Sequence, residues 1–285
     1  MDIQILNHEE FIKLSNFIQS NFGIKMPEVK KSLLESRLQK RLKLLKLNNF
    51  SEYCKYLLSS EGLENELPFF IDRITTNKTD FFREDEHFDY LINQVLPRIL
   101  LNGGKKYNIL KVWSAGCSSG EEPYTLAMVI SDFFEKNRLS SIKLSILATD
   151  VSQEVLQIAK AAVYPEIRAI PIPQHLKKKY LLKSKSRENK QIKIAPEIRR
   201  LVTFGKLNFM DSNYGFVDKF EIIFCRNVII YFDKITQNRI LSNIISHLVT
   251  GGYFFQGHSE TIQGIDLPLK QLSPTIYIKD RDLVN

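Results

Sequence analysis

The first quarter of the chain carries apolar residues at the three- and four-residue spacing of helices. An apolar stripe of this period lets a helix bury one face against its neighbours. The pattern predicts helices across residues 8–74, and we expect them to form a small all-α domain over residues 1–75. The residues of the two clearest stripes are Phe11, Leu14, Phe17 and Ile18, and then Leu34, Leu38, Leu42 and Leu45.

Short apolar runs alternate with helical patterns from residue 96 onward, after a linker that we place at residues 76–95. A turn of small residues at 114–120 precedes a helix from about Glu122, and Ser152 is the expected N-cap of a helix over 152–162. This alternation predicts an α/β fold with a mostly parallel sheet, helices on both faces and ligands at the carboxyl ends of the strands. The expected strands are 109–113, 143–148, 202–204, 221–224 and 253–256.

Residues 177–203 interrupt this alternation. Short strand-like pieces at 179–183 and 191–194 flank the polar loop 184–190, and residues 199–204 follow as another. We therefore expect a small antiparallel β-subdomain inserted in the larger domain, which spans residues 96–285.

Composition and termini fit an ordered globular chain. Hydrophobic residues make up 44% and charged residues 25% of the sequence, which excludes a disordered composition. The first ten residues lack a secretory signal pattern, and no apolar run is long enough to cross a bilayer. We expect a cytoplasmic protein without membrane insertion. Cys54, Cys117 and Cys225 lack metal-site spacing, so buried thiols and no metal are expected.

The net charge of +8 is concentrated in two segments. Residues 25–46 hold eight basic and two acidic residues, and residues 168–206 hold twelve basic and two acidic residues. In the first segment, Arg37, Lys40 and Arg41 share a helix face away from the leucine stripe. A solvated basic surface explains such an excess in most proteins, whereas a binding role would require an acidic partner.

The turn after the first strand favours a nucleotide-like cofactor, because small residues let the backbone approach a ligand. Gly116 and Gly120 do not have dinucleotide-binding spacing, and no Gly-Lys-Ser/Thr follows them. Glu121 and Glu122 suit the positive end of a helix dipole. Asp150, at the end of the second strand, can accept both ribose hydroxyl hydrogens. These features outline an adenosine pocket without a phosphate cradle, which S-adenosylmethionine fits.

Five segments of the chain, in the same order, resemble the signatures of the chemotaxis receptor methyltransferase (CheR) family. The resemblance extends to about Ile278, and it implies a Rossmann-like methyltransferase domain preceded by the all-α domain. Family positions differ at Lys111, Ser119, Phe209 and Glu221, none of which removes a polar group that the mechanism requires. The segments are 75–84 (TTNKTDFFRE), 113–124 (WSAGCSSGEEPY), 148–150 (ATD), 223–232 (IFCRNVIIYF) and 257–260 (GHSE).

The resemblance implies a role for each matching residue. Glu122, in preference to Glu121, would bind the amino group of S-adenosylmethionine, and Asp150 would hold its ribose. Arg83 and Tyr231 are the expected catalytic residues, which orient the incoming carboxylate. The other implied cofactor contacts are Asn77, Thr79 and Arg83 closing over the cofactor, Asn208 and Phe209 beside the adenine, and Arg226 and Asn227 on the opposite side.

The implied reaction forms glutamate γ-methyl esters on methyl-accepting chemotaxis receptors and yields S-adenosylhomocysteine. The basic helix around Arg37, Lys40 and Arg41 and the β-subdomain would face the receptor. We expect a monomer that binds no nucleic acid, because the basic segments lack interleaved aromatic residues. The alternatives are a methyltransferase that acts on RNA or a small molecule, and a non-catalytic cofactor-sensing module.

Overall fold

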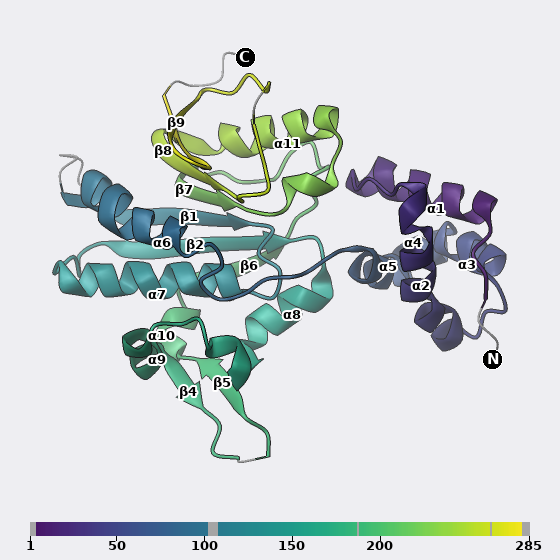
Figure 1. Cartoon of the computed structure of the whole chain (residues 1–285), viewed down its shortest axis with the longest axis horizontal. Coiled ribbons are helices and arrows are strands. Elements are labelled where there is room, and N and C mark those ends of the chain that lie inside the picture. The colour runs from purple at the N-terminus through teal and green to yellow at the C-terminus, as the bar shows by residue number, and fades with distance from the viewer. Residues whose placement is uncertain (1–3, 102–107, 187, 263, 281–285) are drawn as a thin grey trace.

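The structure, a computed structural model, describes residues 4–101, 108–186, 188–262 and 264–280. It confirms the all-α domain followed by an α/β domain, and Figure 1 shows the two side by side. No helix in these ranges combines the length and apolar character that crossing a bilayer requires. The helices of the first domain are α1 (His8–Phe22), α2 (Lys31–Leu45), α3 (Phe50–Leu57), α4 (Ser60–Asn65) and α5 (Leu67–Ile74).

Local signals set the limits of these helices. The Asn7 side chain accepts the backbone N–H of Glu10, and the Glu10 carboxylate accepts the N–H of Asn7, so α1 begins with a capping box. Gly23, at φ 70°, ends α1 in the left-handed conformation that glycine tolerates best. The predicted stripes, including Phe11 and Leu38, are buried in one core.

A segment that we call the strap, residues 75–85, joins the domains and leads into α6 (Glu86–Tyr90). Two π-helical turns, Leu91–Val95 and Pro97–Leu101, continue α6.

The described residues form a main sheet of seven strands in the order β6-β2-β1-β7-β8-β10-β9. The first five are mutually parallel, and β10 runs antiparallel to both of its neighbours, β8 and β9. Both faces are covered: α6, α7 (Glu121–Lys136) and α8 (Gln153–Ala161) pack on one side, and α11 (Lys234–Ser246) packs on the other. The strands are β1 (Ile109–Ala115), β2 (Lys143–Asp150), β6 (Val202–Lys206), β7 (Phe220–Cys225), β8 (Leu248–Gln256), β9 (Leu269–Ser273) and β10 (Ile276–Lys279).

A separate antiparallel sheet of three strands, in the order β3-β5-β4, forms the β-subdomain at the lower edge of Figure 1. Its strands β4 (Leu181–Lys183) and β5 (Gln191–Ile194) match the expected hairpin. Two details of the prediction were wrong. The sheet also includes β3 (Val163–Pro165), and in place of a third strand at 199–204 the chain ends α10 (Pro196–Arg199), turns, and enters β6 of the main sheet at Val202.

The start of the hairpin also differs from the prediction. Lys179 is the penultimate residue of helix α9 (Gln174–Tyr180) rather than part of a strand. Leu176 and Tyr180, four residues apart, are both buried on one side of this helix, so tertiary packing favours the helical turn.

The two domains touch at the carboxyl edge of the main sheet. The backbone N–H of Lys25 donates to the carbonyl oxygen of Tyr231 at 2.8 Å, beside an antiparallel bridge between Ile24 and Phe232. On the other side, the Ser152 hydroxyl donates to the Asp72 carboxylate at 2.7 Å. The helical domain is thus fixed over the ends of the strands, where a parallel sheet binds ligands.

Candidate active site

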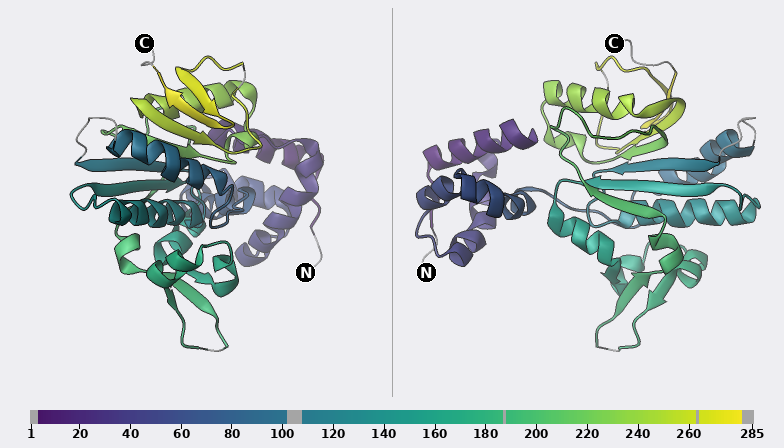
Figure 2. Two further views of the ribbon diagram at one scale, coloured as in Figure 1. Left: turned by 60° about the vertical axis from the view of Figure 1, so that its left-hand side comes forward. Right: turned by 180° about the vertical axis from the view of Figure 1, so that it is seen from behind.

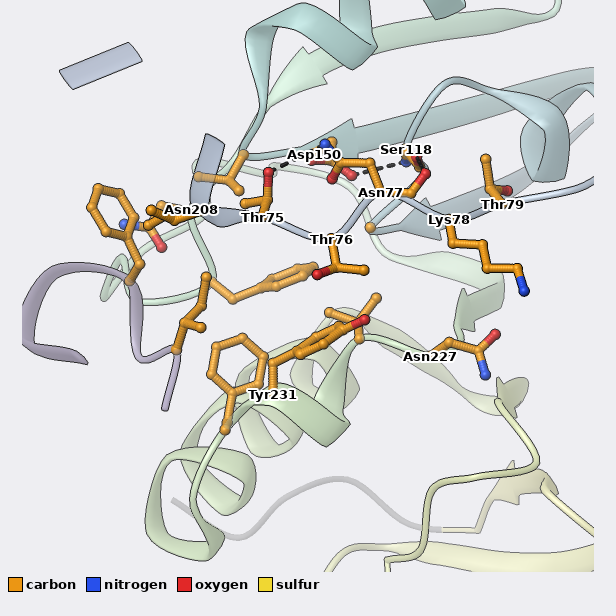
Figure 3. A pocket seen from close by; sticks show the side chains of 18 of the residues that line it. Thr75, Thr76, Asn77, Lys78, Thr79, Ser118, Asp150, Asn208, Asn227 and Tyr231 are labelled. Atoms are coloured by element: carbon orange, nitrogen blue, oxygen red, sulfur yellow. Dashed lines mark hydrogen bonds between the residues drawn. The ribbon is translucent and has the colours of Figure 1, made fainter. Parts of the chain in front are cut away.

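One cleft lies between the strap, the helical domain and the strand ends. Figure 3 shows Asp150 and Ser118 on one wall, Tyr231 on the opposite wall, and the strap between them. The structure brings together at this cleft all ten residues that the resemblance assigns to the site: Asn77, Thr79, Arg83, Glu122, Asp150, Asn208, Phe209, Arg226, Asn227 and Tyr231.

The turn after β1 forms the floor of the cleft. Gly116 has φ 83°, and a Cβ atom there would lie 2.4 Å from a methyl carbon of Val228, so glycine is needed for both conformation and space. Ser118 follows at φ 48° and donates its backbone N–H to the Asp150 carboxylate at 2.8 Å. The sequence did not single out Ser118, because neither this backbone contact nor the partner of its hydroxyl can be recognised before the chain is folded.

Asp150 is oriented by two backbone donors, one on each carboxylate oxygen. Ser118 donates to Oδ2 and Ser152 donates to Oδ1 at 3.0 Å, so each oxygen keeps a lone pair for another donor. Burial raises the pKa of Asp150, although the backbone N–H groups of Ser152, Ser118 and Val151 act in the opposite direction. The carboxylate can therefore accept hydrogen bonds from a ligand with two adjacent hydroxyl groups.

The two acids that begin α7 have separate environments. The Glu122 carboxylate lines the cleft, where it accepts the Ser114 hydroxyl at 2.6 Å and Nε of Arg226 at 2.7 Å. Glu121 is 1% exposed and pairs with Arg168 and the Ser119 hydroxyl. Only Glu122 of this pair faces a potential ligand.

Arg226 is a buried cation at the end of β7. Its Nη1 donates to the carbonyl oxygen of Arg83 at 2.7 Å, and it lies 3.4 Å from the Glu84 carboxylate. The guanidinium also lies 5.2 Å from the ring centroid of Phe88. Because it bonds Glu122 and the strap together, Arg226 supports the cleft as well as lining it.

Arg83 has a different environment. Phe82 and Glu84, on either side of it, have φ 55° and 54°, a conformation that is costly for residues other than glycine and is concentrated at functional sites. Its Nη1 donates to the Lys78 carbonyl oxygen at 3.0 Å. Within the described ranges, no carboxylate lies within ion-pair distance of this guanidinium, so its charge is available to a ligand.

The remaining strap residues are held at the turn. The Ser118 hydroxyl donates to the Asn77 carbonyl oxygen at 2.9 Å, and Arg168 donates to the Thr79 carbonyl oxygen. Thr79 is buried. These bonds place the strap across the mouth of the cleft.

Tyr231 and Asn208 combine contact with the helical domain and a position at the cleft. Tyr231 is half-buried, and its hydroxyl has no hydrogen-bond partner among the described residues. Asn208 donates its side-chain N–H to the Asn21 carbonyl oxygen at 2.8 Å, and Phe209 packs edge-on against Tyr214.

Asn227, in the turn that follows β7, has φ 58° and donates its side-chain N–H to the Glu84 carboxylate at 3.2 Å. Its turn is held by Glu260, a buried carboxylate that accepts the backbone N–H groups of Asn227, Val228, Ile229 and Gly257. Glu260 belongs to the GHSE motif, but only the folded chain shows which N–H groups it accepts.

Arg37, Lys40 and Arg41 were expected to face a receptor from α2, but two of these three side chains are engaged inside the helical domain. Arg37 lines the cleft and donates to three carbonyl oxygens at the end of α5, and Arg41 pairs with Glu66, whose side chain is 1% exposed. Lys40 is exposed. Helical spacing places these residues correctly on one side of α2, but α5 packs against that side.

Comparison with known proteins agrees with these features. Residues 77–278 match the family described as CheR methyltransferase, SAM binding domain, and residues 9–75 match CheR methyltransferase, all-alpha domain. A chemotaxis protein methyltransferase of Borreliella burgdorferi is 42% identical over 278 residues, which are 96% of this chain and 95% of that protein. A chemotaxis protein methyltransferase of Escherichia coli is 32% identical over 279 residues, 97% and 93% of the two chains. This chain belongs to the CheR family of S-adenosylmethionine-dependent methyltransferases.

Proposed function

We propose that this chain transfers the methyl group of S-adenosylmethionine to glutamate side chains of chemotaxis receptors. The observation that supports this most strongly is the cleft itself, where Asp150, Glu122, Arg83 and Tyr231 converge although they are far apart in sequence. The named relatives are chemotaxis protein methyltransferases, which favours receptors as the substrate.

The cofactor contacts in this proposal follow from the donor set. Asp150 has lone pairs for the ribose hydroxyls, and Glu122 offers a buried carboxylate to the amino group. Phe209 and Asn208, which line the cleft, would lie beside the adenine. Asn77, Thr79 and Asn227 complete the enclosure.

Bound S-adenosylmethionine would supply an activated methyl group on a sulfonium. A glutamate carboxylate is already ionised at neutral pH, so its attack on that carbon needs no general base. The protein's task is alignment, which can contribute several kcal/mol. In this proposal Arg83 binds one oxygen of the incoming carboxylate by a charge-assisted hydrogen bond, and the Tyr231 hydroxyl donates to the same group.

The receptor would approach past the helical domain, whose Lys30 and Leu33 line the cleft beside Tyr231. Exposed Lys40 and Lys43 on α2, and Lys185 and Lys190 on the β-subdomain, would attract acidic receptor helices. Arg37 and Arg41 would act indirectly by holding α2 on α5. Because receptors of this kind carry their methylation sites on cytoplasmic domains, we place the protein in the cytoplasm.

The test is incubation of the protein with methyl-labelled S-adenosylmethionine and a receptor cytoplasmic fragment, followed by mild base. A carboxyl methyl ester releases labelled methanol under these conditions, whereas amine and ribose methylation do not. The matched control is a fragment whose candidate glutamates are replaced by alanine. Label that stays on the receptor after base treatment, or that is unchanged in the control fragment, would contradict the proposal.

A further inference from the structure

A buried histidine lies directly behind the cleft. His87 in α6 is 1% exposed and does not line the cleft. Its Nδ1 lies 3.0 Å from Nη1 of Arg226, and its Nε2 lies 2.8 Å from the hydroxyl oxygen of Thr275. The imidazole therefore connects the turn between β9 and β10 to the arginine that bonds Glu122.

The two contacts define the protonation of the ring. The Arg226 guanidinium can only donate, so Nδ1 of the neutral ring is the acceptor, and the Thr275 hydroxyl, which has the Pro274 carbonyl oxygen at 2.7 Å as its own acceptor, is free to accept from Nε2. Nε2 must then carry the proton, and the lone pair on Nδ1 accepts from the Arg226 guanidinium. Burial, and then the charge of Arg226, lower the pKa of His87 to about 3, which keeps the ring neutral.

Thr275 is itself held in an uncommon conformation. Its φ is 59°, which is costly for a β-branched residue. Its carbonyl oxygen accepts the backbone N–H of Gln256 at 2.9 Å, so the turn is bonded to the end of β8. Strain of this kind persists where surrounding contacts fix a required geometry.

We infer that His87 is a positioning residue that, held by Thr275, orients Arg226 and through it the Glu122 carboxylate for the cofactor. The sequence of bonds runs from Thr275 to His87, then to Nη1 of Arg226, and from Nε of Arg226 to Glu122 at 2.7 Å. The same Nη1 donates to the Arg83 carbonyl oxygen, so the strap is oriented as well. This inference rests on the proposed function in one respect, the role of Glu122 as a cofactor ligand.

A metal site is the main alternative for this cluster. Glu84, His87 and His258 have potential ligand atoms within 4.8 Å of one another. However, the Nδ1 lone pair of His87 already accepts from a guanidinium, and a cation there would be repelled by Arg226. His258 lies 3.0 Å from the Glu86 carboxylate, toward solvent.

The experiment measures the affinity for S-adenosylhomocysteine by calorimetry, which needs no receptor. His87→Leu keeps the volume but removes the acceptor, and we expect it to raise Kd about tenfold, as for the loss of a hydrogen bond to a charged group. His87→Asn places a side-chain oxygen near the position of Nδ1 and should restore affinity to within about threefold of the wild type. Thermal unfolding of each variant identifies any that fail to fold.

A second pair of variants avoids the core. Thr275→Val removes the hydroxyl that accepts from Nε2 and should raise Kd about threefold, and Thr275→Ser should leave Kd unchanged. Nitrogen NMR of the wild-type ring should show Nε2 protonated and Nδ1 unprotonated at neutral pH, and Thr275→Val should keep this tautomer because the Arg226 guanidinium still donates to Nδ1.

Several results would overturn the inference. They are an Nδ1-protonated or doubly protonated ring in the wild type, unchanged Kd in folded His87→Leu, or tight binding of Zn²⁺ that displaces the Arg226 contact. Failure of the wild type to bind S-adenosylhomocysteine would instead refute the proposed function, so the two failures are distinguishable.

Discussion

Arg83 and Arg226 line the same cleft, but the structure predicts opposite consequences of replacing them with methionine. Arg226 is 6% exposed and is bonded to Glu122, so Arg226→Met leaves a buried carboxylate without its cation. Breaking a buried pair in this way costs about 3–5 kcal/mol of the free energy of unfolding. In a domain of this size each kcal/mol lowers Tm by about 2–4 °C, so we expect a fall of roughly 6–20 °C.

Arg83→Met should leave the fold nearly intact. Its guanidinium donates to a single backbone carbonyl oxygen, that of Lys78, on the exposed side of the strap. Loss of this bond costs at most about 1 kcal/mol. If Arg83 binds the incoming carboxylate, the loss of a charge-assisted bond worth about 1.5–3 kcal/mol should lower kcat/KM about 10- to 150-fold.

The assay compares thermal unfolding, affinity for S-adenosylhomocysteine and methanol-releasing turnover for both variants. The reasoning would be refuted by an Arg83→Met variant that keeps wild-type kcat/KM. It would equally be refuted if Arg83→Met lowered Tm as much as Arg226→Met does, because Arg83 would then be part of the scaffold.

Three further predictions concern other parts of the molecule. Tyr231→Phe removes a hydroxyl that has no partner in the described chain, so kcat should fall about tenfold while Tm stays unchanged. An unchanged kcat would show that Tyr231 only packs at the cleft. Lys40→Glu should weaken receptor methylation at low salt but leave cofactor binding unchanged, because Lys40 is exposed. Arg41→Met should lower the free energy of unfolding by about 3 kcal/mol, because buried Glu66 loses its cation. Destabilisation by Lys40→Glu together with weaker receptor methylation in a fully stable Arg41→Met would contradict these two assignments. Burial raises the pKa of Asp150, so the folded state favours the protonated carboxyl; the stability that this proton contributes is present below the unfolded pKa and is lost as pH rises through the folded pKa. Asp150→Asn should remove this part of the pH dependence of the free energy of unfolding. An unchanged pH profile would show that burial does not destabilise the carboxylate.

The sequence predicted the elements with strong periodicity or clear end signals. The structure confirms the apolar stripes of α1 and α2, the strand and turn before Glu122, and Ser152 as the N-cap of α8. Asp150 could be placed because the carboxyl ends of neighbouring parallel strands meet at one edge.

Features that depend on tertiary packing could not be predicted in the same way. Strand β3 has three residues and ends at Pro165, which is too short for an alternating pattern, and β9 and β10 were not foreseen. The spacing of Arg37 and Arg41 defined a face of α2 but not the helix α5 that packs on it. Likewise, only the folded chain shows that Glu121 turns to Arg168 while Glu122 faces the cleft.

The central claim is that the cleft beneath the strap binds S-adenosylmethionine through Asp150. The most direct measurement is calorimetric titration of S-adenosylhomocysteine into the wild type and into Asp150→Asn. We expect one site per chain in the wild type, and an affinity about 10- to 100-fold weaker in the variant, because an amide cannot accept two ribose hydroxyls while receiving both backbone N–H groups. No binding to the wild type, or equal affinities in the two proteins, would contradict this account.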